Sequence, residues 1–331
     1  MPLRIGIIGC GEIAQYAGLF ARIDPGLQIT ACCDSAAGAA AAFAKRFRVP
    51  KVYDSYCELL ADPKVDALYI AVPHHFHFEM LLAAIEARKP ALCEKPVTRT
   101  LAEGKEIVRL SKAAGVKIGV NYQYRYDSGA YALAQAARRG DLGRLLYARC
   151  NLSWRRTIEY FRQGVWRGSL AAAGGGTLLT QGSHLLDLAI WAMGSPPAAV
   201  VGMTAHRRFD VEVEDFAQGI VELADGAQIE ITSSMVAARE ERLSVEIYGE
   251  KATGVYSDRP WPHVRFAGAS VRARRVPVFG LHALHRSLRA FRNWVVKDCP
   301  FLIPAEEALP ALAAVEGIYR SASSGCKEQI R

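Results

Sequence analysis

The chain has 331 residues, a net charge of +8, 51% hydrophobic residues and 22% charged residues. This composition excludes a disordered protein, and the length exceeds what one hydrophobic core usually spans, so we expect two domains. The sequence shows neither a run of about 18 apolar residues nor an export signal, which predicts a protein that does not enter the membrane.

Basic residues are spread along the chain rather than clustered with aromatic ones, which argues against nucleic acid as a partner. The densest basic stretch is 265–275, where Arg272, Arg274 and Arg275 alternate as on one side of a strand. We expect a solvated face there, with an anionic ligand as the alternative.

The eight cysteines show no C-x-x-C spacing and no neighbouring histidine pattern typical of zinc. Four of them, Cys10, Cys32, Cys33 and Cys93, fall in or beside apolar strands. Reduced, buried thiols are the ordinary interpretation of such positions, so we predict a cytoplasmic protein.

The first predicted strand, 4–9, leads into Gly9-Cys-Gly11-Glu12-Ile13-Ala14. Glycines at these positions let the backbone approach a pyrophosphate at the start of the following helix. A second strand, 27–33, ends at Asp34, whose carboxylate is placed to bind the adenosine ribose; the alternative is an N-cap for the next helix, 36–47. No arginine follows Asp34 to receive a 2′-phosphate, so we predict NAD in preference to NADP.

A buried strand, 65–72, ends in Pro73-His74-His75-Phe76-His77. Three histidines in four residues invite a metal site, but no carboxylate or thiolate pattern completes one, and we predict none. We expect this loop to touch the ribose of the cofactor, with His77 opening a helix that runs to about Arg88.

The next strand, from Ala91, ends at Glu94-Lys95-Pro96, where Pro96 cannot join the hydrogen-bond ladder. Carboxyl ends of parallel strands are where open α/β sheets bind ligands, although a solvated ion pair is the alternative. A helix over 101–114 and a strand over 116–120 follow. This alternation predicts an α/β domain, 1–122, with a doubly wound parallel sheet.

The second predicted domain, 123–331, has a different pattern, in which strands follow one another without intervening helices. We expect helices at 128–139, 281–296 and 305–323, and strands at 145–154, 199–207, 215–223, 227–234, 242–248 and 251–256. Asp225-Gly226 is a hairpin signal, so this is an α+β domain with a mostly antiparallel open sheet. Clean alternation at 211–214 and 228–231 indicates a face left to bury, which predicts a homodimer or homotetramer.

An insertion at 166–187 interrupts the strands and contains Gly174-Gly-Gly176. Three consecutive glycines suggest backbone pressed against a ligand or the other domain. Thr180, His184 and Asp187 then share one helix face. A satisfied core histidine is the alternative to a functional one.

Together these motifs resemble the glucose–fructose oxidoreductase / inositol dehydrogenase (Gfo/Idh/MocA) family over essentially the whole chain. The markers are the glycine fingerprint, Pro73-x-x-x-His77, Glu94-Lys95-Pro96, Tyr122-Gln-Tyr-Arg125, Trp166-Arg167, Gly174-Gly-Gly176 through His184-x-x-Asp187, and Tyr248-Gly249. The resemblance implies an N-terminal Rossmann domain and an NAD(P)-dependent enzyme that acts on a secondary hydroxyl of a sugar or cyclitol.

The resemblance also implies roles for single residues. Lys95 and His184 would hold the reacting hydroxyl as catalytic residues. Cofactor-binding positions are then Gly9, Gly11, Glu12, Ile13, Asp34, Pro73, His74, His77, Glu94, Lys95, Gln123 and Trp166, and substrate-binding positions are Thr180, Gln123, Arg156, Tyr160 and Arg167. One departure matters, because many members carry an acidic residue where this chain has Thr180, and threonine cannot act as a base near neutral pH.

Three functions remain open at this point. The first is a sugar dehydrogenase, in which Lys95 assisted by His184 takes the hydroxyl proton. The second is an NAD-dependent glycosidase that oxidises its sugar transiently, eliminates the aglycone and reduces again. The third is a non-catalytic sugar or nucleotide sensor, against which the presence of both Lys95 and His184 speaks.

Overall fold

The computed structural model describes residues 1–239 and 241–330, and the chain divides into two compact units. The first unit comprises Met1–Tyr122 and Val278–Ala308, and the second comprises Gln123–Pro277 and Leu309–Arg331. The boundary after Tyr122 lies where the sequence placed it. Residues 278–308, which we predicted in the second domain, belong instead to the first unit.

The first unit is built on a six-stranded parallel sheet in the order β3-β2-β1-β4-β5-β6. Its strands are β1 (Leu3–Ile8), β2 (Leu27–Cys33), β3 (Lys51–Tyr53), β4 (Ala67–Ile70), β5 (Ala91–Cys93) and β6 (Ile118–Val120). The chain order reverses between β1 and β4, which is the switch point of a Rossmann fold and the place where such sheets bind ligands.

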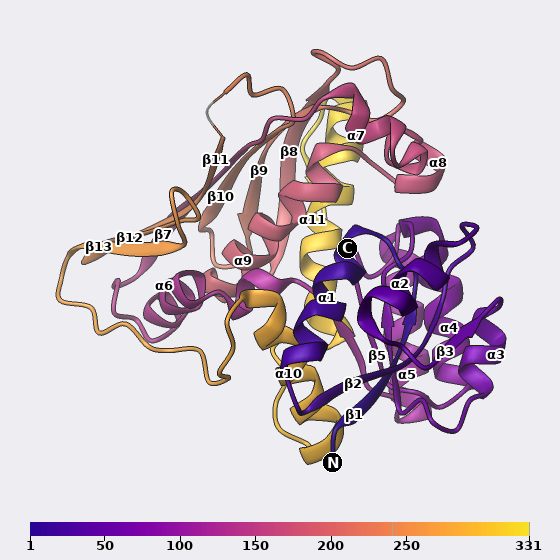
Figure 1. Cartoon of the computed structure of the whole chain (residues 1–331). Coiled ribbons are helices and arrows are strands. Elements are labelled where there is room, and N and C mark those ends of the chain that lie inside the picture. The colour runs from indigo at the N-terminus through magenta and orange to yellow at the C-terminus, as the bar shows by residue number, and fades with distance from the viewer. Residues whose placement is uncertain (240, 331) are drawn as a thin grey trace. The chain divides into compact units, whose positions relative to one another are not determined.

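Helices cover this sheet in two groups (Figure 1). One group contains α1 (Glu12–Ile23), α2 (Ala39–Phe47) and α10 (Ala283–Lys297), and the other contains α3 (Tyr56–Ala61), α4 (His77–Glu86) and α5 (Leu101–Ala114). The capping box of Thr100 and Glu103 starts α5, and Gly115 ends it with φ +65. Helix α2 begins three residues later than predicted, because the chain first turns through Gly38 at φ +75.

Three contacts of α10 explain why 278–308 returns to the first unit. In α10, His285 Nε2 lies 2.9 Å from Asp24 Oδ2, and Arg289 Nε lies 3.1 Å from the same oxygen. The His285 ring also stacks on Phe20 of α1 at 5.1 Å between centroids. A buried polar contact thus joins segments that lie about 260 residues apart in the sequence. No local sequence pattern predicts this contact.

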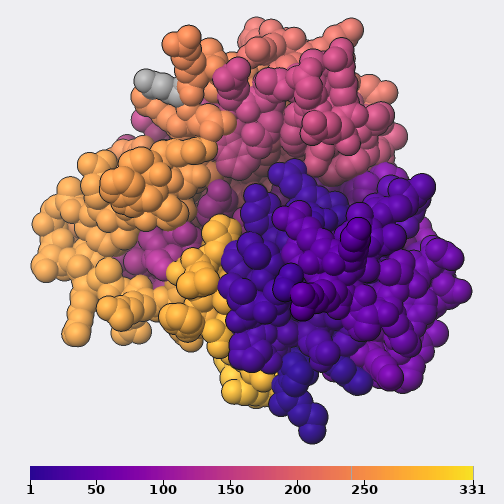
Figure 2. Space-filling model, in the orientation of Figure 1, coloured from indigo at the N-terminus to yellow at the C-terminus, as the bar shows by residue number. Residues whose placement is uncertain are grey.

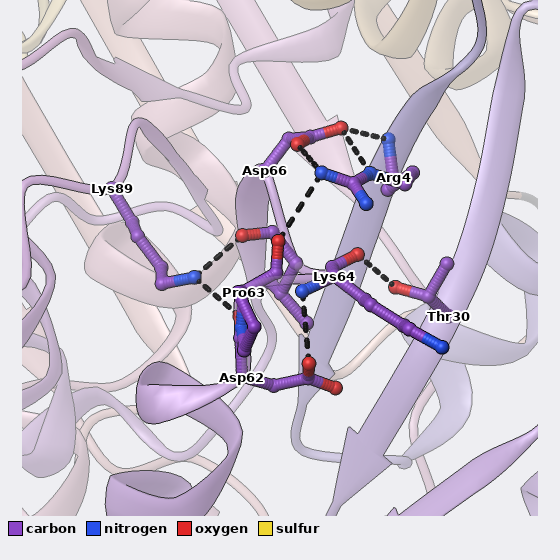
Figure 3. A network of polar contacts seen from close by, with 8 residues as sticks. Arg4, Thr30, Asp62, Pro63, Lys64, Asp66 and Lys89 are labelled. Carbon is purple, nitrogen blue, oxygen red and sulfur yellow. Dashed lines mark hydrogen bonds and ion pairs between the residues drawn. The ribbon is translucent and has the colours of Figure 1, made fainter.

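A polar network fixes the amino ends of β1 and β4 (Figure 3). Arg4 Nε donates to Asp66 Oδ2 at 2.9 Å, and Lys89 Nζ donates to the carbonyl oxygen of Asp62 at 2.8 Å. Burial lowers the pKa of Lys89. The network secures the turn before β4 at the amino ends of the strands. The glycine loop lies at the opposite, carboxyl ends, where ligands bind, and takes no part in this network.

The second unit contains an eight-stranded sheet in the order β13-β12-β11-β7-β10-β9-β8-β14. The strands are β7 (Leu145–Ser153), β8 (Pro197–Ala205), β9 (Phe216–Leu223), β10 (Gln228–Ser234), β11 (Arg242–Gly249), β12 (Ala252–Ser257), β13 (His263–Gly268) and β14 (Glu328–Gln329). β7 and β10 pair in parallel, and the other pairs are antiparallel. The predicted fold class is therefore confirmed, with β13 and β14 as unpredicted additions.

Helices pack on one face of this sheet (Figure 1). They include α6 (Ser128–Arg138), the fully buried α9 (Ser183–Met193) and α11 (Ala305–Ser324). Ile318 of α11 lies against Gly202 and Gly219, where a Cβ would come within 2.6 and 2.8 Å of its side chain. The opposite face exposes Val201, Met203 and Ile220 at the β8–β9 side.

Two local predictions for this unit are wrong. Residues 211–214 form a loop before β9 rather than an alternating strand. Arg272, Arg274 and Arg275 lie outside any strand, because β13 ends at Gly268 with φ +105 and the chain continues irregularly. All three arginines are exposed, on a segment that forms part of the outer surface in orange (Figure 2).

An insertion between β7 and α9 shares a small hydrophobic core with the segments that follow β8 and β10. It contains α7 (Ile158–Arg162), a 3₁₀ turn (Val165–Gly168), α8 (Leu170–Ala173) and a π-helical turn (Leu178–Gly182) that leads directly into α9. The buried core residues are Phe161, Ala173, Phe209, Val213 and Met235. None of the described helices is long and apolar enough to cross a membrane.

Candidate functional site

The glycine loop of the first unit has the form that a pyrophosphate requires. Gly9 has φ +89, and a Cβ there would lie 2.5 Å from the carbonyl oxygen of Ala71. Gly11 precedes α1, and among the described residues no side chain caps the first turn of that helix. A Cβ on Gly11 would meet no described atom within 4 Å. The start of α1, which follows Gly11 directly, is therefore the place where this loop could receive an anion.

Asp34 is not the N-cap of α2, which is Gly38, but it holds the glycine loop at the carboxyl end of β2. Its Oδ2 accepts a hydrogen bond from Cys10 N in the glycine loop at 2.6 Å, and its Oδ1 accepts one from Ala36 N at 2.7 Å. The residue stays partly exposed, and each carboxylate oxygen has a second lone pair. Asp34 thus holds the glycine loop and can still accept hydrogen bonds from ribose hydroxyls.

His77 links the ends of β4 and β5. It is fully buried, with Nδ1 2.7 Å from the carbonyl oxygen of Pro96 and Nε2 3.0 Å from that of Val72. Burial lowers the pKa of His77 to about 4, against the two carbonyls, which favour the protonated ring. We therefore interpret His77 as a pin between the loops that follow β4 and β5. The cofactor contacts of Pro73 and His74 stay predictions.

Glu94 points into a buried polar network within the first unit. Its Oε1 accepts hydrogen bonds from Tyr69 Oη at 2.5 Å and Asn121 Nδ2 at 2.6 Å, and Ser287 Oγ donates to Asn121 Oδ1 at 2.8 Å. Burial raises the pKa of Glu94, although both donors favour the carboxylate. The network fixes the backbone on one side of Lys95 as His77 fixes it on the other.

Sequence reasoning missed Tyr69, Asn121 and Ser287. Tyr69 and Asn121 could have been noticed, because each places a polar group at the end of an apolar strand beside β5. Ser287 could not, because it belongs to α10, far away in the chain. Lys95 itself is partly exposed.

In the second unit, two of the three consecutive glycines, Gly175 and Gly176, lie against protein, where we expected a ligand or the other domain. A Cβ at Gly176 would lie 1.8 Å from the carbonyl oxygen of Glu214, and one at Gly175 would lie 2.3 Å from Tyr319 Oη. Glu214 accepts hydrogen bonds from Gly176 N at 2.7 Å, Leu178 N at 2.9 Å and Tyr319 Oη at 2.9 Å. Burial raises the pKa of this carboxyl. Glu214 thereby holds the start of the π-helical turn that carries Thr180.

Thr180, His184 and Asp187 occupy successive turns and are all buried. Thr180 Oγ1 donates to the carbonyl oxygen of Gly176 at 2.6 Å, so its hydroxyl proton is committed within the turn. His184 packs edge-on against Tyr124 with 5.2 Å between ring centroids. Asp187 pairs with Arg125 through two hydrogen bonds of 2.9 and 2.8 Å. A π-helical turn before His184 is a feature frequent at functional sites.

The predicted substrate residues Arg156, Tyr160 and Arg167 come together in the insertion. The Arg156 guanidinium carbon lies 5.1 Å from the Tyr160 ring centroid and 4.9 Å from that of Trp154. The Arg167 carbon lies 4.8 Å from the Tyr160 ring and 5.5 Å from the Trp166 ring. We name Trp154, Arg156, Tyr160 and Arg167 the arginine–aromatic stack; Trp154 was not predicted. Gln123 lies apart from it, half-buried in a 3₁₀ turn at the start of this unit.

A pocket of about 830 Å³ opens at the ends of β11 and β12. It is lined by Arg239, Glu241, Arg242, Leu243, Ser244, Ser257, Arg259 and Pro260. Its described lining includes none of the predicted site residues, and Arg259 is paired with Glu241 at 2.6 Å. We therefore base the site on the motifs rather than on this pocket. Within the described part of the chain, no three His, Cys, Asp or Glu side chains are grouped so that they could hold a metal ion.

Comparison with known proteins gives concordant results. The family model described as an oxidoreductase family with an NAD-binding Rossmann fold matches residues 3–122, and that of the Gfo/Idh/MocA C-terminal domain matches residues 131–255. The chain is 27% identical to the 1,5-anhydro-D-fructose reductase of Ensifer adhaerens, over 99% of this chain and 98% of that protein. It is 25% identical to the D-glucoside 3-dehydrogenase of Escherichia coli (strain K12), again over 99% and 98%. The structure of the WlbA dehydrogenase from Bordetella pertussis, in complex with NADH and UDP-GlcNAcA, matches with a TM-score of 0.90 at 26% identity, covering 100% of this chain and 99% of that one.

Proposed function

Because the chain belongs to the Gfo/Idh/MocA family of NAD-binding oxidoreductases, we propose that it oxidises a secondary hydroxyl of a sugar, sugar derivative or cyclitol. Two sets of contacts on either side of Lys95 carry the proposal. His77 lies within hydrogen-bond distance of the Pro96 carbonyl oxygen, and Glu94 accepts hydrogen bonds from Tyr69 and Asn121. Both are at the carboxyl ends of the strands of a Rossmann sheet, where such sheets bind ligands. The relatives named for anhydrofructose and glucoside substrates support a sugar as the substrate class.

The first unit would hold NAD by groups already in place. The N–H groups at the start of α1 would bind the pyrophosphate, and Asp34 would accept hydrogen bonds from the adenosine ribose. Bound NAD supplies a hydride acceptor. No part of this proposal needs the glycine loop to rearrange, because Asp34 already ties Cys10 N in position.

Lys95 would take the proton of the reacting hydroxyl. A lysine serves as a base where its surroundings disfavour the ammonium form, and anchors on both sides keep its backbone in one position. His184 of the second unit would assist by orienting the hydroxyl or by passing the proton to solvent. Thr180 would contribute an acceptor oxygen only, because its hydroxyl proton is committed to Gly176.

A spectrophotometric screen for NADH tests this function. The purified chain with NAD would be offered free sugars, cyclitols, sugar phosphates and nucleotide sugars, and the Lys95→Met variant would serve as the inactive control. NADH formation by the native chain alone supports the dehydrogenase. Release of an aglycone from glycosides without net NADH would instead support the glycosidase, and silence in both assays with NAD bound would contradict an enzyme.

A cytoplasmic location is part of the same proposal. All eight cysteines lie in the described part of the chain as free thiols, and five of them are buried. Free thiols of this kind persist in reducing compartments.

A further inference from the structure

We propose that the arginine–aromatic stack of the second unit binds an anionic group of the substrate, a carboxylate or a phosphate. This inference rests on the proposed oxidation of a sugar hydroxyl and narrows its substrate class. The substrate would be an acidic, phosphorylated or nucleotide-linked sugar rather than a neutral one.

The stack fixes two cations close together. Both guanidinium carbons lie over the single ring of Tyr160, at 5.1 Å for Arg156 and 4.8 Å for Arg167. A guanidinium that stacks on an aromatic face can bind an oxyanion through two parallel hydrogen bonds at its edge. Two like charges sharing one ring repel each other, and an anion bound at their edges relieves that repulsion.

Two buried donors of the stack await an acceptor. Trp154 Nε1 and Arg156 Nε are both inaccessible to solvent and have no hydrogen-bond partner among the described residues. Arg156 Nη1 donates to the carbonyl oxygen of Arg155 at 3.2 Å, and within the described residues Arg156 forms no ion pair. Buried donors in folded proteins nearly always have a partner, and an unpaired buried charge is costly. An anionic ligand would accept hydrogen bonds from the two donors and would also balance the charge of Arg156.

The stack lies at the same end of the second sheet as the π-helical turn that contains Thr180. Trp154 directly follows β7, and its N–H donates to the carbonyl oxygen of Ser234 at the end of β10 at 2.9 Å. The adjacent Ser233 Oγ lies 2.8 Å from Thr177 Oγ1, just before the π-helical turn. One substrate can therefore present a hydroxyl near Thr180 and His184 and an anionic group to the stack.

The neighbouring pocket at β11 and β12 is a weaker candidate for this anion. Its Arg259 is already neutralised by Glu241 at 2.6 Å. In the segment 154–167, by contrast, four arginines stand against the single carboxylate of Glu159. The pocket also contains Arg239 and Arg242, so charge alone does not separate the two places. The stack is favoured because two cations share one ring there and two of its buried donors lack a partner among the described residues.

Four probes in the NADH assay test the inference: D-glucose, D-glucuronate, D-glucose 6-phosphate and UDP-glucose. The native chain should oxidise at least one anionic probe with a KM well below that for D-glucose. Arg156→Gln should raise that KM roughly 10- to 100-fold, the range for a charged hydrogen bond, and leave the affinity for NAD unchanged. The control is Arg144→Gln, which removes an exposed arginine paired with Glu250 in the same unit and should leave the KM within a factor of two to three.

Companion variants separate charge from folding. Tyr160→Phe keeps the ring and should keep the KM, whereas Tyr160→Leu should raise it, because the guanidiniums lose their support. Arg156→Lys should fall between the native chain and Arg156→Gln. Added salt should raise the KM for the anionic probe and leave that for D-glucose nearly unchanged. A KM that responds to these changes for D-glucuronate identifies the anion as a carboxylate. A KM that responds for D-glucose 6-phosphate or UDP-glucose identifies it as a phosphate.

The outcomes distinguish this inference from the proposed function. If only D-glucose is oxidised, and its KM is the same for the native chain and for Arg156→Gln, the anionic subsite is overturned. The proposed dehydrogenase activity stands in that case. NADH from none of the probes counts against the dehydrogenase, and tryptophan fluorescence titration with the three anionic probes then decides the subsite. Binding lost in Arg156→Gln and kept in Arg144→Gln supports it, and no binding to the native chain overturns it.

Discussion

Arg125 holds the carboxylate of Asp187 through two parallel hydrogen bonds, Nε to Oδ2 at 2.9 Å and Nη2 to Oδ1 at 2.8 Å. Both side chains are at most 3% exposed. The pair joins the start of the second unit to α9, the helix that carries His184. Tyr124, next to Arg125, contacts the His184 ring directly, so the ion pair fixes the segment that packs against His184.

Breaking this pair should destabilise the second unit strongly. Asp187→Asn leaves a buried guanidinium without its counter-charge, and we expect a loss of about 3–5 kcal/mol in the free energy of unfolding. Trp191 lies 5.2 Å from the Arg125 guanidinium and provides a fluorescence signal for denaturant titration. The control Glu250→Gln breaks the exposed pair with Arg144 and should cost less than about 1 kcal/mol. Similar losses in both variants would contradict the structural role of Asp187.

The pin at His77 predicts a pH dependence of stability. The folded chain holds this ring neutral down to about pH 4, whereas the unfolded chain takes up the proton near the ordinary pKa of 6.5. Unfolding therefore binds a proton between these values, so the contribution of His77 is full above pH 6.5 and is lost progressively as the pH falls toward 4.

Denaturant titrations across this pH range measure the effect. His77→Gln should flatten the fall in stability between pH 6.5 and 4, and should also lower stability at neutral pH because the pin is weakened. His206→Gln, which changes an exposed histidine of the second unit, should leave the slope unchanged. An unaltered slope in His77→Gln would show that other groups titrate in this window.

Lys95→Met should reduce turnover by about 10²–10⁴, the usual range for losing a general acid or base. NAD affinity should hardly change, because the groups proposed for the pyrophosphate and ribose lie at α1 and Asp34. His184→Ala should also lower turnover, and the double variant should fall well short of the product of the two losses. Thr180→Ala should matter least.

Steady-state kinetics and NAD titration of these variants provide the measurement. Lys64→Met removes an exposed lysine elsewhere in the first unit and is the matched control. A Lys95→Met protein with near-native turnover would show that the proton leaves by another route.

NAD should bind more tightly than NADP by roughly ten- to over a hundredfold, because the carboxylate of Asp34 hydrogen-bonds a ribose hydroxyl but repels a 2′-phosphate. Asp34→Ser should narrow this preference and also weaken NAD, since it removes the acceptor for Cys10 N. Asp54→Ser, at an exposed position of the first unit, should change neither affinity. Fluorescence titration with both cofactors decides, and equal or tighter NADP binding would sink the prediction.

The chain should assemble as a homodimer or homotetramer through the open face of the second sheet. That face is mixed rather than uniformly apolar: Val201, Met203 and Ile220 are each nearly half exposed at one side, whereas Arg149 and Glu230 pair at its centre. Ile220→Glu should shift the mass found by light scattering toward the monomer, because it places a charge in the apolar part. Val296→Glu, in α10 of the first unit, is the control. A monomer mass for the native chain at micromolar concentration would refute the assembly.

The sequence by itself determined the elements whose signals are local. Strand β2 (Leu27–Cys33) and helix α5 (Leu101–Ala114) have the predicted bounds. A buried parallel strand is a short apolar run between turn residues, and a helix announces its start and end by caps such as Thr100 and Gly115. The glycine fingerprint was recognisable for the same reason, since its backbone geometry arises within a few residues. Asp34 was noticed only as the residue after β2, and its bond to Cys10 N joins positions 24 residues apart.

Only the tertiary structure decided which side chains face one another. Asp187 lies three residues from His184 on the same helix face, and its carboxylate pairs with Arg125, 62 residues away in the chain. The glycines at 174–176 were expected to press against a ligand or the other domain, and two of them, Gly175 and Gly176, lie against Tyr319 and Glu214. A buried charge takes whichever partner the packed chain brings to it, because leaving it unpaired costs several kcal/mol. Periodicity reports that a residue is buried, but the identity of its partner depends on segments that the fold alone brings together, as α10 is brought to α1 by Asp24 and His285.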